Sequence, residues 1–292
     1  MSWIMAHPAA SLSYGFLYLS VLLLWLPGRR TAPNWSIALS LSVLLGLTSH
    51  LLDPVAIIPI TLLAFAAYYS QAEKSRALVR WTAGVTVLVL SAGLATHQFP
   101  GFHNLNVLDH VTISKDAVPY TFYLNFDKAA VGIFILGFSY QLISGRDKWV
   151  PLFKKIAVKL PLVIFITIFA AFILGFVTFD FKIPNDILIW TITNLLFVCV
   201  AEEALFRTFI QNNLSLTMRK IKYGDRLAVL ITAILFGLVH YPSGTKYVIL
   251  AMVAGMGYGW VYVVTRRVEA SIMTHFGVNL IHILFFTYPA LR

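Results

Sequence analysis

A series of apolar segments, each long enough to cross or nearly cross a bilayer, most constrains how this chain can fold. A spanning helix needs about 20 apolar residues. In hydrocarbon, each backbone N–H and C=O must also be bonded within the spanning structure. Turn residues or charges separate ten such segments: 10–27, 35–52, 54–70, 80–98, 128–144, 157–179, 186–210, 226–241, 246–264 and 270–287. The sequence therefore predicts an all-α, polytopic transmembrane helical bundle of about ten spans (eight to ten).

The composition agrees with a membrane protein. The chain has 292 residues, of which 59% are hydrophobic and 12% are charged. A soluble domain of average composition is about 45–50% apolar and about 25% charged. The formal net charge of +10 would also fit a protein that binds nucleic acid, so the placement of the basic residues has to decide between the two classes.

The basic residues gather in alternate loops. Those loops hold 16 of the 22 Lys and Arg residues: Arg29, Arg30, Lys74, Arg76, Arg80, Arg146, Lys148, Lys154, Lys155, Lys159, Arg219, Lys220, Lys222, Arg226, Arg266 and Arg267. Apart from Arg207, the rest lie on the other side: Lys115, Lys128, Lys182, Lys246 and Arg292. This alternation is the positive-inside pattern. It predicts a multi-pass integral protein with both termini outside, which we assign to the bacterial inner membrane, with the lipid bilayer and no nucleic acid as a partner.

The longest hydrophilic stretch, 99–127, falls on the non-cytoplasmic side. It is rich in aromatic residues, Asn and Pro, a composition that favours an ordered loop over a flexible linker. We therefore divide the chain into an N-terminal transmembrane extension (1–98), this loop (99–127) and a membrane-embedded domain (128–292).

Several residues have plain structural interpretations. Ala251, Gly255 and Gly259 recur at four-residue spacing, which lets helices pack closely in lipid. Cys199, the only cysteine, lies in an apolar run and is interpreted as a small core residue. Five histidines are expected to form structural hydrogen bonds or to lie in loops: His50, His97, His103, His110 and His282.

Two glutamates and an arginine lie where the body of a membrane helix is expected. Glu202, Glu203 and Arg207 follow the apolar run 187–200. Each charge costs about 2.5–3.5 kcal/mol at a bilayer centre, so such charges usually mark a functional site. On an α-helix Glu203 and Arg207 are four residues apart and share a face, whereas Glu202 points about 100° away from Glu203. The pattern predicts one carboxylate held by an arginine and one available for proton transfer.

Two later segments supply partners, because charges in lipid face the interior of a bundle. One segment is Phe236–His240 (FGLVH), and the other is His275–Asn279 (HFGVN). A carboxylate and an imidazole can hold and deprotonate a water molecule, and an imidazole and a carboxamide can stabilise an oxyanion. Together with Glu202 these residues predict a hydrolytic site.

The residues leave other chemistries open. Glu202, His240 and His275 could instead bind a divalent metal such as zinc, with a position left for water. Asparagine is a poor zinc ligand, so Asn279 fits the oxyanion role better. The sequence contains no HExxH, Gly-x-Ser-Gly or Gly-x-Gly-Asp, so zincin, serine and aspartyl mechanisms have no motif here. A proton relay in an ion-coupled transporter is a further alternative, although no repeat symmetry supports it.

At these residues the sequence resembles the CPBP family of intramembrane proteases, which includes CAAX prenyl endopeptidases and bacteriocin-processing or immunity proteins. Three family motifs occur in order: Glu-Glu-x-x-x-Arg at Glu202–Arg207, Phe-x-x-x-His at Phe236–His240 and His-x-x-x-Asn at His275–Asn279. Each motif alone is weak, but all three in order are specific. The resemblance covers about residues 150–292.

The resemblance implies an intramembrane endopeptidase that cleaves a membrane-associated protein or peptide. It implies that Glu202 activates water with the help of His240, and that His275 and Asn279 form an oxyanion hole. Glu203 and Arg207 would hold the site together, with Phe236 as further support. The family is commonly labelled a metalloprotease, and a glutamate-dependent mechanism without a catalytic metal has also been proposed for it. Some members act as scaffold or immunity proteins without established proteolysis, so a non-catalytic role stays an alternative.

Overall fold

The computed structural model describes residues 7–26, 33–72, 74–139, 142–143 and 145–292. Two of the predicted cytoplasmic basic residues, Arg29 and Arg30, lie outside them. The chain forms two compact units. The N-terminal unit comprises Met1–Leu105, Tyr123–Ser144 and Leu196–Leu205. The C-terminal unit comprises Asn106–Phe122, Gly145–Leu195 and Phe206–Arg292. The division predicted at residues 98 and 127 stays a prediction.

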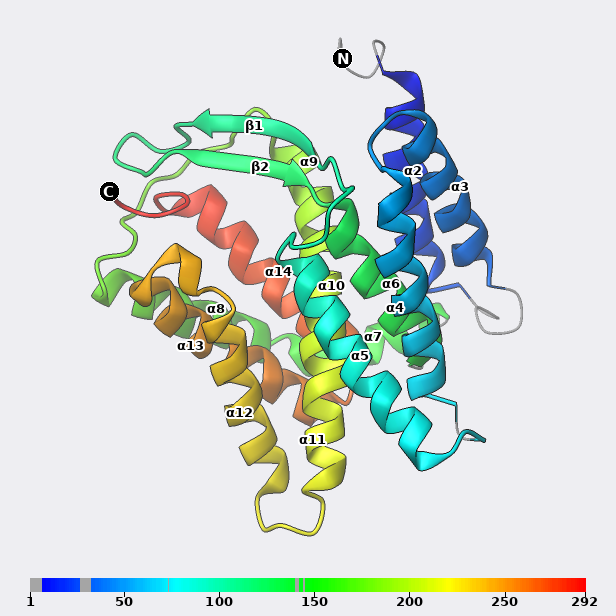
Figure 1. Ribbon diagram of the computed structural model, residues 1–292. Coiled ribbons are helices and arrows are strands. Elements are labelled where there is room, and N and C mark those ends of the chain that lie inside the picture. The colour runs from blue at the N-terminus through cyan, green and yellow to red at the C-terminus, as the bar shows by residue number, and fades with distance from the viewer. Residues whose placement is uncertain (1–6, 27–32, 73, 140–141, 144) are drawn as a thin grey trace. The chain divides into compact units, whose positions relative to one another are not determined.

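The N-terminal unit is built from apolar helices around one buried helix. Its helices are α2 (Pro8–Leu23), α3 (Asn34–Thr48), α4 (Ile57–Ser70), α5 (Ala77–Ala95), α6 (Phe126–Ser139) and the short α10 (Val200–Glu203). Helices α2 and α3 lie side by side (Figure 1), and Ser13 and Ser42 each donate a hydrogen bond to the other's carbonyl oxygen at 2.7 Å. Helix α6 packs against α2, α4, α5 and α10, so it is the centre of this unit.

A glycine brings α6 close to the helix that carries the two glutamates. A Cβ atom at Gly132 would lie 2.9 Å from the Cα atom of Ala201, which is tighter than ordinary carbon–carbon contact. Only a residue without a side chain allows this approach. The second turn of α6 is therefore held beside Ala201, the residue before Glu202.

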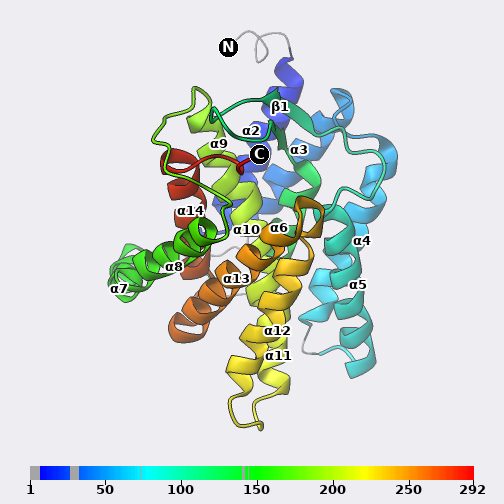
Figure 2. The ribbon, with the colours of Figure 1, turned by 90° about the vertical axis from the view of Figure 1, so that its left-hand side faces the viewer.

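The C-terminal unit has a second set of helices. They are α7 (Arg146–Ile156), α8 (Lys159–Ile173), α9 (Ile187–Thr193), α11 (Asn212–Thr217), α12 (Gly224–Leu238), α13 (Thr245–Thr265) and α14 (Val268–Phe285). Helix α13 packs against α8, α12 and α14. Figure 2 shows α11 and α12 as two antiparallel rods joined by a loop, and α7 and α8 as consecutive helices.

The predicted stripe of small residues lies in the packed interior of this unit. A Cβ atom at Gly255 would lie 3.4 Å from the Cα atom of Ala233 in α12, and one at Gly259 would lie 2.8 Å from Oε1 of Gln211. Ala251 is buried on the same helix. The prediction of close helix packing is confirmed, and the stripe brings α13 against both α12 and the side chain of Gln211. Cys199 is buried, as predicted for a core residue.

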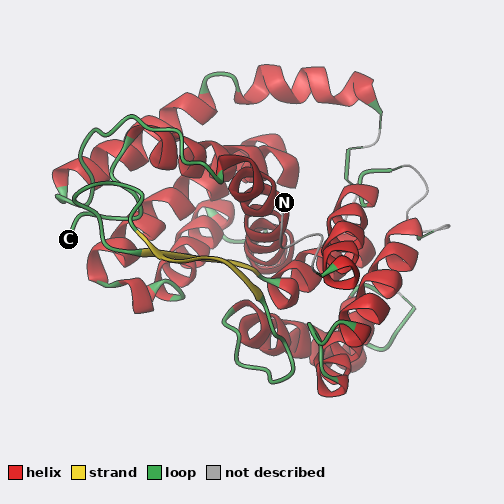
Figure 3. Ribbon diagram, turned by 90° about the horizontal axis from the view of Figure 1, so that it is seen from above, coloured by secondary structure: helices red, strands yellow, loops and turns green. Residues whose placement is uncertain are grey.

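The segment predicted to be an ordered loop forms a β-hairpin. Strands β1 (Leu105–Val111) and β2 (Tyr120–Leu124) pair in a two-stranded sheet, drawn in yellow in Figure 3. Within the C-terminal unit, the residues before β2 bind the chain's last residues. Val118 N donates to Ala290 O at 3.0 Å, and Arg292 Nε donates to Ala117 O at 2.8 Å.

The helices support an integral membrane protein. Each of the ten predicted segments coincides with a helix in the described residues. Four helical stretches in the described residues are long and apolar enough to cross a membrane: Ala77–Ala95, Ile187–Thr217, Thr245–Thr265 and Val268–Phe285. The number is five if the bent pair α7–α8 is counted as one span. Large apolar side chains are exposed on several helices, among them Phe65, Trp81 and Phe165. Soluble proteins rarely expose so much apolar surface.

Candidate functional site

The two glutamates lie between two unusual helical stretches. Within the continuous helix Ile187–Thr217, α10 carries Glu202 and Glu203, and π-helix precedes it at Asn194–Cys199 and follows it at Ala204–Gln211. A π-helix bonds residue i to residue i+5, is rare, and is frequently found at functional sites. The expectation that Glu203 and Arg207 follow regular α-helical geometry is therefore wrong, because the wider π-helical turn begins at Ala204.

Glu202 forms an ion pair within the N-terminal unit. Its Oε1 accepts a hydrogen bond from Nζ of Lys128 in the first turn of α6 at 2.6 Å. The side chains of the lysine and the glutamate are 15% and 11% exposed. A nearly buried carboxylate therefore has a nearly buried cation as its partner, which is the arrangement that lowers the cost of both charges in an apolar surrounding.

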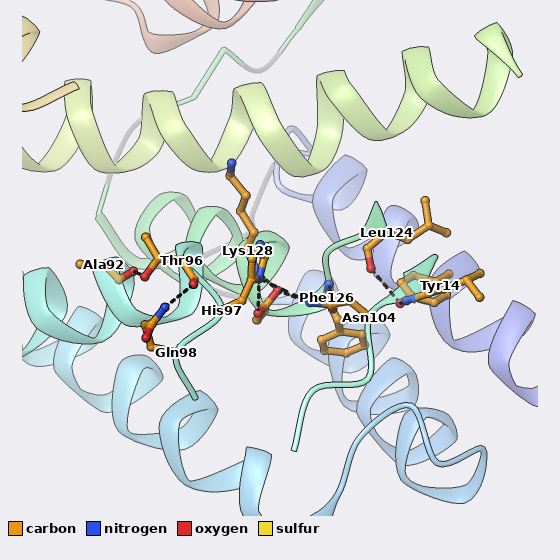
Figure 4. Close-up of polar contacts among 11 residues, drawn as sticks. Tyr14, Ala92, Thr96, His97, Gln98, Asn104, Leu124, Phe126 and Lys128 are labelled. Carbon is orange, nitrogen blue, oxygen red and sulfur yellow. Dashed lines mark hydrogen bonds and ion pairs between the residues drawn. The ribbon is translucent and has the colours of Figure 1, made fainter. Parts of the chain in front are cut away.

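Lys128 follows a residue that is itself held on several sides. The carboxylate of Asp127, which is buried, accepts hydrogen bonds from Nδ1 of His97 (2.7 Å), Nδ2 of Asn104 (3.0 Å) and the backbone N–H of Lys128 (2.9 Å). Asn104 also accepts a bond from the backbone N–H of Phe126 at 2.8 Å. Figure 4 shows this cluster, with the Lys128 side chain extending away from it toward the helix that bears Glu202. The start of α6 is thereby fixed in position.

In the C-terminal unit, Phe236 is the point at which the other two motifs meet. Its ring centroid lies 4.9 Å from that of His240 and 5.9 Å from that of His275. The guanidinium carbon of Arg207 lies 5.6 Å from the same centroid, a cation–π contact. Arg207 also donates to Oε1 of Gln211 at 3.1 Å. The structure therefore brings together Arg207, Phe236, His240 and His275, all of which the sequence analysis singled out.

A backbone contact of His240 indicates which tautomer its ring adopts. Its Nδ1 lies 2.6 Å from the carbonyl oxygen of Phe236. Because a carbonyl oxygen only accepts hydrogen bonds, Nδ1 must carry the proton. In the neutral ring Nε2 is then the nitrogen that can accept a proton. The ring is half-buried and also contacts Tyr247.

His275 and Asn279 lie on α14 and are positioned by different neighbours. The buried His275 ring stacks on Tyr258 of α13, with centroids 4.6 Å apart and planes 16° apart. The amide of Asn279 donates from Nδ2 to Oδ1 of Asn194 at 3.1 Å. Asn194 begins the first π-helical stretch, so that stretch helps to orient the Asn279 carboxamide.

The residues that the sequence analysis missed were Lys128, Asn194, Gln211 and Tyr258. The sequence analysis used Lys128 only as one of the basic residues from which the membrane topology was inferred. The signal that could have found it is its place at the start of an apolar segment, where a charge is retained for topology or for a partner. Of the five histidines that were expected to be structural or to lie in loops, four form side-chain bonds, to Asp127, Asp53, Asp109 and the Thr287 carbonyl oxygen.

The metal alternative concerns Glu202, His240 and His275. Among the described residues, no group of three or more His, Cys, Asp and Glu side chains is arranged to hold a metal ion. Within the C-terminal unit the two histidines contact one phenylalanine ring, and one nitrogen of His240 is bonded to a backbone carbonyl oxygen. The donor set considered for zinc is divided between the two units, with Glu202 in one and His240 and His275 in the other, so metal binding at these residues stays a prediction.

Comparison with known proteins gives one match. A family model described as "Type II CAAX prenyl endopeptidase Rce1-like" matches residues 184–281. That segment contains all three motifs, from Glu202 to Asn279. The match confirms the resemblance predicted from them. No curated protein and no solved structure matches the chain.

Proposed function

Because residues 184–281 match a family model of type II CAAX prenyl endopeptidases, we propose that this integral membrane protein is an intramembrane endopeptidase. Its substrate is a membrane-associated protein or peptide. The observation that carries the proposal is that one family match includes both glutamates, both histidines and the asparagine of the three motifs. Buried charges of this kind are costly in an apolar protein, which favours a functional reason for keeping them.

The proposed reaction begins with Glu202 as the general base. Its carboxylate takes a proton from a water molecule while the water oxygen bonds to the carbon of the substrate's peptide carbonyl. His240 assists by holding the water, because its Nε2 is the acceptor nitrogen when Nδ1 donates to the Phe236 carbonyl oxygen. The tetrahedral intermediate then collapses, the C–N bond breaks, and the proton held by Glu202 passes to the departing amine.

His275 and Asn279 are proposed to stabilise the oxyanion of the tetrahedral intermediate. An imidazole N–H and a carboxamide N–H are both suitable donors, and fixed donors contribute most when they are oriented before the reaction. Two contacts support this role. Stacking on Tyr258 fixes the ring plane of His275, and the bond to Asn194 fixes the amide of Asn279.

Glu203, Arg207 and Phe236 are proposed as supporting residues. Phe236 contacts the two histidines and Arg207, so its ring sets the spacing among them. Arg207 is held by Gln211, which in turn donates to the Gly259 carbonyl oxygen at 3.0 Å. We also propose Glu203 as a charge partner of Arg207.

The topology completes the proposal. We propose a multi-pass protein of about ten spans, eight to ten, in the bacterial inner membrane with its basic loops in the cytoplasm. The placement of a helix at each of the ten apolar segments supports this number. Its partners are the bilayer and the membrane-associated substrate.

The test compares protein N-termini in host membranes at matched expression. Cells carry wild type, Glu202→Gln, or Glu269→Gln as a control that makes the same change at another buried glutamate. Folded protein is quantified for each by thermal unfolding in detergent. We expect specific new N-termini with wild type and Glu269→Gln, and none with Glu202→Gln. If wild type and Glu202→Gln give the same N-termini although both fold, the proposal is wrong and a scaffold or immunity role takes its place.

A further inference from the structure

We propose that Lys128 is a positioning residue for Glu202, so that helix α6 contributes to catalysis. The inference rests on the proposed function, in which Glu202 is the general base. Lys128 lies outside residues 184–281, which match the protease family. The ion pair thus connects a motif residue to a part of the chain with no other assigned role.

The geometry makes Lys128 suited to orient a carboxylate. The Nζ–Oε1 distance of 2.6 Å is short, as expected for a charge-assisted hydrogen bond. Both side chains are nearly buried, so water screens the pair less than it screens a surface pair. A carboxylate has about four acceptor positions on its two oxygens. The bond from Lys128 occupies one of these positions, on Oε1, and so fixes the orientation of the group.

The base of the lysine is rigid, which positioning requires. Asp127, the neighbouring residue, is bonded to His97, Asn104 and the backbone N–H of Lys128. At the next turn of α6, Gly132 packs against Ala201. These contacts fix the start of α6 relative to α10, so the lysine reaches Glu202 from a defined point.

Charge gives a second reason for the pairing. Removing one partner of a buried ion pair leaves an uncompensated charge, which is more harmful than removing both. The charged residues next to the two partners in the sequence are Asp127 at the start of α6 and Glu203 on α10. Both are acidic, so Lys128 supplies the positive charge that α6 offers to this carboxylate.

The first experiment measures steady-state kinetics in purified protein. The substrate is a fluorogenic peptide built on a cleavage site found in the N-terminus comparison. The variants are Lys128→Met, Lys128→Arg, and Lys115→Met, a control that makes the same change at an exposed lysine. We expect Lys128→Met to lower kcat by about 100-fold, as for a misplaced catalytic group, with KM little changed. Lys128→Arg should recover much of the loss, and Lys115→Met should match wild type.

Other outcomes would overturn the inference. A raised KM with unchanged kcat would make Lys128 a substrate-binding residue. A lower Tm with unchanged kcat would make its role purely structural. If wild type cleaves no more than Glu202→Gln, the proposed function itself fails, and the catalytic role of Lys128 fails with it. If wild type cleaves and Lys128→Met has the same kcat, only the inference about Lys128 is wrong.

The second experiment tests the ion pair without using activity. Thermal unfolding is measured for Lys128→Met, Glu202→Gln and the double variant. We expect Lys128→Met to lower Tm strongly in wild type, because the Glu202 carboxylate then loses its cation. The same change should lower Tm much less in the Glu202→Gln background, because the substituted side chain carries no charge. Equal shifts in the two backgrounds would show that the residues are not paired. If Lys128→Met alone does not accumulate, failure of the double variant to restore folded protein would likewise contradict the pairing.

Discussion

The two units hold the residues of the candidate site by different physical means. In the N-terminal unit, buried carboxylates bond to side-chain nitrogen atoms: Glu202 bonds Lys128, and Asp127 bonds His97. In the C-terminal unit, the histidines and Arg207 lie against aromatic rings, above all that of Phe236. A carboxylate needs a counter-charge in an apolar surrounding, whereas a neutral imidazole needs only a hydrogen bond and a flat neighbour. The difference teaches that the carboxylates of the site depend on polar partners, whereas its histidines depend on aromatic neighbours.

The largest effect should follow from breaking the aromatic support. Phe236→Ala removes the ring shared by His240, His275 and Arg207 and leaves a cavity in a buried position, so we expect the free energy of unfolding to fall by about 3–5 kcal/mol. Thermal unfolding in detergent measures it. The matched control is Phe169→Ala, which truncates an exposed phenylalanine of α8. Equal losses in the two variants would contradict the central place given to Phe236.

A smaller effect should follow from breaking the hydrogen bonds of Asp127, the residue that precedes Lys128. Asp127→Asn keeps the size of the side chain but loses the charge that binds His97 and Asn104, so we expect a loss of about 2 kcal/mol. Urea-induced or thermal unfolding can report it. Asp109→Asn, which alters an exposed histidine–aspartate pair, should change stability little. A stability loss as small as that of the control would mean that the Asp127 cluster does not fix α6.

The smallest effect should follow from removing the aromatic ring that stacks on His275. Tyr258→Phe keeps the ring that stacks on His275, and Tyr258→Leu removes it. The Leu variant should be less stable than the Phe variant by about 0.5–1.5 kcal/mol, the range for an aromatic pair. The difference between the two unfolding free energies isolates the stack from the hydroxyl group. If the Phe variant is as unstable as the Leu variant, the hydroxyl group is what matters.

Much of the helical fold could be predicted, because the signals are local. Apolar runs bounded by turns or charges placed a helix at each of ten positions, and the small residues of α13 predicted close packing. The two π-helical stretches could not be predicted, because their i to i+5 bonding is not visible in composition or periodicity. The same limit explains why the predicted register of Glu203 and Arg207 assumed a regular α-helix.

The residues of the candidate site divide in the same way. Phe236 and His240 are one motif, so their proximity follows from helical spacing. The pairing of Lys128 with Glu202 joins residues 74 positions apart, and a single lysine at the start of an apolar segment also fits a purely topological role. Asn194 and Tyr258 belong to no motif, and their contacts with Asn279 and His275 depend on tertiary packing. Local patterns therefore found the reactive groups, but not the residues that hold them.

The ion pair between Lys128 and Glu202 also has a consequence for how these two positions vary among related proteins. A mutation that removes either charge is harmful until the other partner changes too, so the two positions are expected to vary together among relatives. A chimera that took its first 130 residues from a relative without a basic residue at this place would keep every protease motif and still lose the counter-ion of its glutamate. The two parts of the gene are therefore expected to have been inherited together rather than exchanged as independent modules.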